Sequence, residues 1–310
     1  MTGPLAPIVL FAFQRPEHTR RTIEALQRNP EARQSILWIF ADGPRSERDA
    51  EKVEETRRIL RGVSGFGEIR LCEREENFGL TRSIRTGITQ AIEEAGRVIV
   101  VEDDIVTAPS FLSYMNAALS RYEHMPLVQS ISAHNLPHGK FAMPKGYEYD
   151  VYASPRPYVW GWGTWRDRWE RVDWSMTGAE RLRHDRSEQR ALDVAGKGPA
   201  KWVRMQCDGE LNSWDIPWIF DHHIKGGLSI HPVYSYVENI GMDGTGVHCT
   251  PSDEFRQDLS RAIRNPRFMP HPYVDPGIMA ACRKFYARPP VIPREIDRIL
   301  KQAGLPPLFT

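Results

Sequence analysis

The sequence lacks the features that would place the protein in a membrane, on a nucleic acid or in an oxidising compartment. No apolar run approaches the roughly 20 residues that cross a bilayer, and residues 1–7 lack the basic-then-apolar pattern of a secretion signal. The 41 basic and 40 acidic side chains leave a net charge of +1, so no overall field attracts nucleic acid. The four cysteines lie far apart without a CxxC pair, which favours reduced thiols and a cytoplasmic location over a zinc site or a disulfide frame.

Glycine-rich nucleotide-binding loops are missing as well. The first predicted strand closes in Phe13-Gln14-Arg15-Pro16, without glycine, and the glycine-rich stretch 241–246 matches neither a P-loop nor a GxGxxG fingerprint. Dehydrogenases and P-loop ATPases are therefore disfavoured. There is no internal repeat and no low-complexity linker, so the 310 residues favour one continuous domain with a C-terminal extension.

What the sequence does contain is an alternation of strand and helix patterns over residues 7–105. Short apolar runs predict strands at 7–13, 36–40 and 98–101, and a third, shorter strand in chain order is expected at 68–72. The segments between them have helical periodicity, and Pro16 suits the first turn of the first helix. This alternation predicts a parallel sheet with right-handed crossovers.

The pattern changes in the rest of the chain. A helix at 109–122 and a strand at 127–132 are still regular, but a loop rich in proline and glycine and an aromatic stretch follow them. Beyond these, the sequence predicts charged helices at 177–208, a helix at 213–226, a strand at 228–237 and short helices in a proline-rich segment from 251.

The fourth strand has the most unusual ending. Its β-branched run at 98–101 predicts burial on both faces, yet it leads directly into Glu102, Asp103 and Asp104. Bare buried carboxylates are costly, so these three need water, donors or a cation. Open α/β sheets bind ligands at the carboxyl ends of their strands, where Mg²⁺ or Mn²⁺ would suit oxygen ligands. The alternative is an ordinary acidic strand end, or an N-cap for the next helix.

Three further charged residues fall at the same predicted edge or beside it. Asp42 closes the second strand and could accept from a nucleobase N–H, or could belong to an ordinary turn. Arg15 closes the first strand and could stack on a base or reach a phosphate, or could be a solvated cation. Arg82 is expected in the first turn of a helix, where a cation opposes the helix dipole. Either a pyrophosphate or a surface pair with Glu75 or Glu76 would account for it.

The middle of the chain is rich in tryptophan. In the stretch 160–165, glycine alternates with tryptophan, so the rings of Trp162 and Trp165 could stack on sugars or bases, or could form a packed core corner. Asp215 follows Trp214 and has apolar neighbours, which tend to raise a carboxyl pKa toward the range useful for a general base. It could equally be a helix N-cap with Pro217 just after it, and both can hold at once.

The last candidate is a glycine-rich loop, residues 238–248, that ends in His248. Backbone N–H groups exposed by glycine can cradle phosphate oxygens. His248 could ligate a metal or donate to a phosphate, or could be a structural loop histidine.

Taken in order, these pieces resemble the nucleotide-sugar glycosyltransferases of the GT-A fold, and within it the N-acetylglucosaminyltransferase I family and its bacterial relatives. The resemblance covers roughly residues 7–250. It rests on Arg15, Asp42, the acidic segment 100–104, Ser132-Ala133-His134-Asn135, the stretch 161–165 with Trp169, Ser213-Trp214-Asp215, and Gly246-Val247-His248. The chain departs from the family at Ser83, where a histidine is expected, at His134, where tryptophan is expected, and by one residue fewer between Val247 and His248.

The resemblance implies a fold and a division of the chain. The fold is a GT-A, Rossmann-like α/β three-layer sandwich with a mixed, mainly parallel central sheet. Residues 1–250 would form the catalytic domain, with a nucleotide-sugar half at about 1–132 and an acceptor half at about 133–250. Residues 251–310 would form a helical, proline-rich extension.

The resemblance also implies roles for the candidate residues. Asp104 would be the direct ligand of Mn²⁺ or Mg²⁺, helped by Glu102 and Asp103, and Asp215 would be the catalytic base. Asp42 would read uracil, which favours a UDP-sugar donor such as UDP-GlcNAc. The remaining donor-site and acceptor-site residues would be Arg15, Arg82 and His248 for the donor, and Trp162, Trp165 and Trp214 for the acceptor.

The expected function is therefore metal-dependent, inverting transfer of a sugar to a hydroxyl of a glycan or glycolipid, without a nucleic-acid partner. A lipid-linked acceptor would add peripheral association with a membrane. One alternative is a non-catalytic carbohydrate-binding protein on the same fold, which the acidic triplet and a candidate base disfavour. The other is a sugar nucleotidyltransferase, which usually has a glycine-rich basic loop after the first strand.

Overall fold

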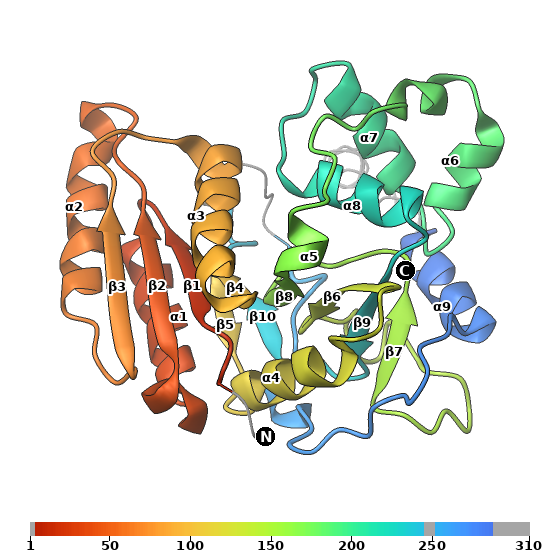
Figure 1. Cartoon of the computed structure of the whole chain (residues 1–310), viewed down its shortest axis with the longest axis horizontal. Coiled ribbons are helices and arrows are strands. Elements are labelled where there is room, and N and C mark those ends of the chain that lie inside the picture. The colour runs from red at the N-terminus through yellow and green to blue at the C-terminus, as the bar shows by residue number, and fades with distance from the viewer. Residues whose placement is uncertain (1–3, 245–251, 288–310) are drawn as a thin grey trace, which may run out of the picture.

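The computed structural model describes residues 4–244 and 252–287. Its first half is the predicted run of parallel strands, which lie side by side in the order β3-β2-β1-β4 (Figure 1). The strands are β1 (Ile8–Ala12), β2 (Ile36–Ala41), β3 (Glu68–Glu73) and β4 (Arg97–Glu102). The connections contain α1 (Pro16–Gln27), a short 3₁₀ helix η1 (Pro30–Gln34), α2 (Glu47–Arg61) and α3 (Gly79–Ala95). The predicted alternation over residues 7–105 is confirmed.

Strands β1 and β2 and the centre of β4 are apolar because helices cover both faces of the sheet, whereas the edge strand β3 is partly exposed. In β1, Ile8 and Leu10 face one core, which α1 also lines, whereas Val9 and Phe11 face a second core lined by α3. The result is three layers. Gly87 lets α3 lie close to the sheet, since a Cβ there would come within 2.6 Å of the Phe11 ring.

The second half extends the same sheet with strands of mixed direction. After β4 come β8 (Trp162–Trp165), β6 (Val128–Ser132), β9 (Leu228–Pro232) and β7 (Val151–Ser154). β8 is antiparallel to β4 and β6, β9 is parallel to β6, and β7 is antiparallel to β9. A separate antiparallel pair joins β5 (Ile105–Thr107) to β10 (Val237–Asn239). The predicted α/β class with a mixed, mainly parallel sheet is confirmed.

Several strands of this half differ from the prediction. The stretch 162–165, for which no strand was predicted, is the buried strand β8. Its Gly163 is needed there, because a Cβ would lie 2.7 Å from the Val98 carbonyl oxygen of β4. The predicted strand at 228–237 is two strands, β9 and β10, in different sheets.

The remaining helices are α4 (Phe111–Tyr122), α5 (Arg166–Trp169), η2 (Ala179–Arg183), α6 (Arg186–Leu192), α7 (Pro199–Cys207), α8 (Asp215–Ile224), η3 (Leu259–Arg261) and α9 (Pro276–Tyr286). In Figure 1, α6, α7 and α8 form a lobe above the second half of the sheet, across from α3. α9 buries Ile278 and Cys282 in one cluster with Phe141 and Tyr152, so it packs on the main body. Within the described ranges, no helix has both the length and the apolar character needed to cross a membrane.

Candidate active site

A cavity of about 1100 Å³ lies where β1, β2 and β4 end and α3 begins. Both halves of the chain contribute to its walls, since Trp160, Trp174 and Asn212 line it from the second half. Six of the predicted site residues line it: Arg15, Asp42, Arg82, Glu102, Asp103 and Asp104. The predicted meeting of these side chains at one sheet edge is thus what the structure shows.

The acidic triplet sits at the end of β4 and in the turn to β5. Glu102 is the last residue of β4. Asp103 faces β1, because its Oδ2 accepts from the backbone N–H of Phe13 at 3.2 Å. Asp104 faces Arg15, whose Nη1 donates to its Oδ2 at 2.8 Å. Gly241 lies against the same carboxylate, and a Cβ at that position would be 2.1 Å from Asp104 Oδ2.

The three carboxyl groups are crowded and poorly solvated. Burial, and then repulsion from Asp104, Asp103 and Asp215, raises the pKa of Glu102 well above its ordinary value. Burial and the charge of Asp104 raise the pKa of Asp103 to about 7. Burial also raises the pKa of Asp104, although Arg15 opposes this. Ionisation of all three at once is therefore unfavourable, and a further positive charge at the site would favour their ionised forms.

This excess of carboxylate oxygen fits a divalent cation completed by a ligand. Within residues 4–244 and 252–287, no three His, Cys, Asp or Glu side chains are grouped so that they alone could hold a metal ion. Mg²⁺ and Mn²⁺ commonly take only one or two protein carboxylates and add water and phosphate oxygens. Glu102 and Asp104 fit that role better than Asp103, whose carboxylate already accepts from the backbone of Phe13.

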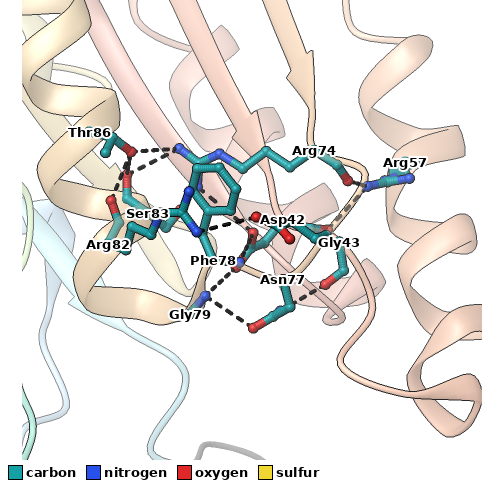
Figure 2. Close-up of polar contacts among 11 residues, drawn as sticks. Asp42, Gly43, Arg57, Arg74, Asn77, Phe78, Gly79, Arg82, Ser83 and Thr86 are labelled. Carbon is teal, nitrogen blue, oxygen red and sulfur yellow. Dashed lines mark hydrogen bonds and ion pairs between the residues drawn. The ribbon is translucent and has the colours of Figure 1, made fainter.

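Asp42 holds the start of α3. Its Oδ1 accepts from the N–H of Phe78 at 2.9 Å, and its Oδ2 accepts from the N–H of Gly79 at 3.0 Å (Figure 2). These N–H groups have no partner within the helix. Asn77 reinforces the turn, because its side chain donates to the Gly43 carbonyl oxygen at 2.7 Å. Each carboxylate oxygen has a second lone pair, so the predicted contact of Asp42 with a nucleobase stays a prediction.

Arg82 lines the cavity and forms the surface pair with Glu76, while its contact with a pyrophosphate stays a prediction. It lies at the cavity and is 58% exposed, yet its Nη1 pairs with Glu76 Oε1 at 3.2 Å and its guanidinium lies 3.6 Å from the centre of the Phe78 ring. Sequence reasoning missed Arg74. This arginine is buried, and it donates to the hydroxyl groups of Ser83 and Thr86 (Figure 2). No pattern in the sequence distinguished Arg74 from the other arginines.

Asp215 is half-buried at the start of α8. The prediction that it is the N-cap was wrong, because Trp214 is the N-cap and Asp215 is the first helical residue. The Ser213 hydroxyl donates to Asp215 Oδ1. The charge of Asp215 contributes to the raised pKa of Glu102, so the candidate base lies within electrostatic reach of the acidic triplet.

The three predicted acceptor tryptophans are buried. Trp162, Trp165 and Trp214 are 1%, 2% and 2% exposed, and Trp162 stacks on Trp214 with ring centres 5.4 Å apart. The proposed stacking on a sugar is therefore corrected, because their ring faces are covered by the core, as in the alternative interpretation of a packed corner. Trp160 and Trp174 are the tryptophans that line the cavity.

One predicted residue cannot be placed. His248 lies outside the described residues. The loop that leads toward it is described as far as Gly244, and it contacts the site through Gly241 and through Asp243, whose Oδ2 lies 3.1 Å from His18 Nε2.

No protein-family model and no curated protein matches the sequence. Among solved structures, the chain is similar to the mannosyltransferase PcManGT from Pyrobaculum calidifontis in complex with GDP-Man and Mn²⁺. The identity is 11%, over 71% of this chain and 69% of that one, with a TM-score of 0.40. It is also similar to an active-site mutant of LgtC, at 13% identity over 72% of each chain with a TM-score of 0.38. S. aureus TarS matches at 11% identity over 75% of this chain and 36% of that one, with a TM-score of 0.39. These likenesses are too distant to carry an argument about function.

Proposed function

We propose that the protein is a nucleotide-sugar-dependent glycosyltransferase. The observation that supports this most is the composition of one cavity, which joins a buried acidic triplet and Arg15 to Asp42. A further carboxylate, that of Asp215, comes from the other half of the chain, and its charge contributes to the raised pKa of Glu102. Residues that could bind a diphosphate and a cation that offsets its charge thus lie near Asp215, a carboxylate that could accept a proton.

The donor would lie across the ends of the parallel strands. Its nucleoside would occupy the end of the cavity near Asp42 and Phe78. The favoured donor is a UDP-sugar. Its diphosphate would lie near Arg15, because the α3 N-terminus is already occupied by the carboxylate of Asp42. When Mn²⁺ or Mg²⁺ is bound, Asp104 and Glu102 would hold it, and it would offset the charge of the leaving diphosphate as a Lewis acid.

The transfer itself would be a single displacement. The Asp215 carboxylate accepts the proton of an acceptor hydroxyl as that oxygen forms a bond to the anomeric carbon of the donor sugar. The bond from the anomeric carbon to the phosphate oxygen breaks on the opposite side, so the nucleoside diphosphate leaves and the configuration inverts. Arg15 faces the acids on the side where the phosphates would lie and would contribute positive charge there.

Donor binding can be tested by thermal unfolding with UDP, GDP and UDP-GlcNAc, each with and without Mn²⁺. A ligand at about 100 times its dissociation constant adds about 2.7 kcal/mol to the free energy of unfolding. We expect the melting temperature to rise most with a nucleoside diphosphate and Mn²⁺ together. In the Asp104→Ala variant, we expect Mn²⁺ to add nothing to the rise that the nucleotide causes.

The exposed Asp167, outside this cavity, offers a matched control in the variant Asp167→Ala, which should respond like the wild type. A melting temperature that no nucleotide changes, with or without metal, would refute the proposal. Binding without release of nucleoside diphosphate from any donor would instead favour a non-catalytic binding protein, and formation of a sugar nucleotide from UTP and a sugar phosphate would favour a nucleotidyltransferase.

A further inference from the structure

The cavity continues along α3, away from the acidic triplet. Besides the residues at the start of the helix, its lining includes Arg85, Thr89 and Glu93, which recur every four residues and so share one face of α3. From Gly79 to Glu93 this wall extends roughly 20 Å, at about 1.5 Å per residue. None of the residues predicted to bind the donor lies on the far part of this wall.

The size of the cavity agrees with two occupants. Sites for single small ligands typically measure about 300–1,000 Å³, and this cavity measures about 1100 Å³. Asn212, three residues before Asp215, lines the cavity, and the Thr81 hydroxyl lies 3.5 Å from Asn212 Oδ1 across it. The segment that leads into the candidate base therefore reaches the cavity at the start of α3, from which the extension runs.

From these observations we infer that the part of the cavity lined by this face of α3 and by Trp174 is an acceptor subsite that binds one neutral hexopyranose ring of a glycan. This inference rests on the proposed function and names the substrate class of its acceptor side. The ring bound here would be a neighbour of the sugar whose hydroxyl reaches Asp215, so the preferred acceptor has at least two sugar rings.

The chemistry of the subsite favours a neutral sugar. Trp174 supplies a flat apolar ring, on which the C–H face of a pyranose can pack, and the Arg85 guanidinium lies 4.5 Å from its centre. Gln90 and Glu93 add exposed hydrogen-bonding groups that suit hydroxyl groups as donors and acceptors. Arg85 and Glu93 carry opposite charges, so the subsite has no net charge that would select a phosphate.

Trp174 is held in place before any ligand arrives. The Asp173 carboxylate accepts from the N–H of Ser175 at 3.0 Å and of Thr177 at 2.7 Å. Met176 has a φ of 53°, in the left-handed region that side chains other than glycine seldom adopt. The Trp169 ring packs against the indole with centres 4.7 Å apart. Such a strained, hydrogen-bonded loop presents the ring with little freedom to lose on binding.

The test compares Trp174→Ala with Trp202→Ala. Trp202 is a matched control, because it is also half-buried beneath an arginine, with Arg156 5.1 Å from its ring, but does not line this cavity. Lactose, cellobiose and N,N′-diacetylchitobiose are the probes, observed by saturation-transfer NMR with UDP and Mn²⁺ present. We expect at least one disaccharide to bind the wild type and Trp202→Ala, and to bind Trp174→Ala about three- to tenfold more weakly.

UDP binding, measured on the same samples, separates the two proposals. If UDP binds but no disaccharide binds the wild type, or if Trp174→Ala binds as tightly as the wild type, the subsite is refuted and the proposed function stands. If neither UDP nor GDP binds with Mn²⁺ present, the proposed function is refuted and the subsite with it. Should Trp174→Ala not fold, Glu93→Gln on the exposed face of α3 tests the same wall, and an unchanged disaccharide affinity in that variant overturns the inference.

Discussion

The two halves of the molecule bury titratable groups of opposite kinds. In the first half, burial raises the pKa of carboxyl groups at the end of β4, that of Asp103 to about 7. In the second half, burial lowers the pKa of three histidines, to about 3 for His134 and His222 and to about 4 for His231. The first half thus contains acids whose ionised forms a nearby cation would stabilise. The second half instead buries histidine side chains that are uncharged at neutral pH.

The halves also differ in how they are assembled. The first consists of strand–helix units in which β1, β2 and β3 follow one another across the sheet, and β4 joins on the other side of β1. In the second, β8 pairs with β4 and β6, and α8 brings Asp215 toward Glu102 from more than a hundred residues away. The candidate site exists only where the two halves meet, so variants on each side should have separable effects on donor binding and on transfer.

The largest expected effect comes from the second half. The Asp215→Asn variant keeps the shape of the side chain but cannot accept a proton, so we expect the turnover number to fall about 10²–10⁴-fold. Nucleotide affinity should be unchanged, because the donor would contact the first half. Release of UDP from a donor with acceptor present measures the first quantity, and thermal unfolding with UDP measures the second.

Asp221→Asn is the comparison for this experiment. Asp221 lies on the same helix, α8, but its carboxylate pairs with Lys225 at 2.7 Å and accepts from the N–H of Asp173. Its loss should lower stability and leave the turnover number of the folded fraction nearly intact. Near-normal transfer by Asp215→Asn would remove Asp215 from the mechanism.

The difference between the halves explains what could be predicted. Three of the four parallel strands were recognised because each contains a continuous apolar run, and the acidic triplet stood out because it ends one of them. β8 was missed because its Trp-Gly-Thr-Trp sequence also suits a turn, and its strand conformation depends on distant partners in β4 and β6. A sequence pattern cannot show which partner a strand will find.

The site residues follow the same division. Arg15, Asp42 and the acids were predicted to converge because parallel strands end at one edge of a sheet, and they do line one cavity. The exposure of individual tryptophans could not be predicted, because Trp160 and Trp162 are two residues apart and their burial depends on which face of the chain meets the core. Of these two tryptophans, only Trp160 lines the cavity.

A second prediction concerns acid stability and separates the halves directly. The three buried histidines stay neutral in the folded state down to about pH 4, whereas in the unfolded state each takes up a proton below its ordinary pKa of about 6.5. Stability is therefore present above pH 6.5 and is lost as the pH falls toward the folded pKa values. At about pH 5.5 each histidine should lower the free energy of unfolding by about 1.4 kcal/mol.

Urea unfolding between about pH 7.5 and pH 5.5, compared for the wild type and His222→Gln, measures this effect. His222 donates from Nδ1 to the Trp218 carbonyl oxygen, and its neutral ring therefore accepts from the Ser130 hydroxyl at Nε2; glutamine can keep such contacts. We expect the variant to be less stable at neutral pH but to lose about 1.4 kcal/mol less on acidification. An identical pH dependence in both proteins would mean that His222 is not neutral in the folded state.

The smallest predicted effect concerns Ser213, which sits where the lobe meets the candidate base. Its hydroxyl donates to Asp215 Oδ1, and its N–H donates to Gln206 Oε1 at 3.0 Å, which ties the turn to α7. A hydrogen bond to an ionised carboxylate favours the ionised form. In Ser213→Ala the carboxylate of Asp215 should be easier to protonate. The acid limb of the pH–rate profile should therefore shift to higher pH, by up to about one unit. Ser213→Thr keeps the hydroxyl and should restore the wild-type profile, whereas a loss of rate without movement of that limb would mean that Ser213 only supports the turn.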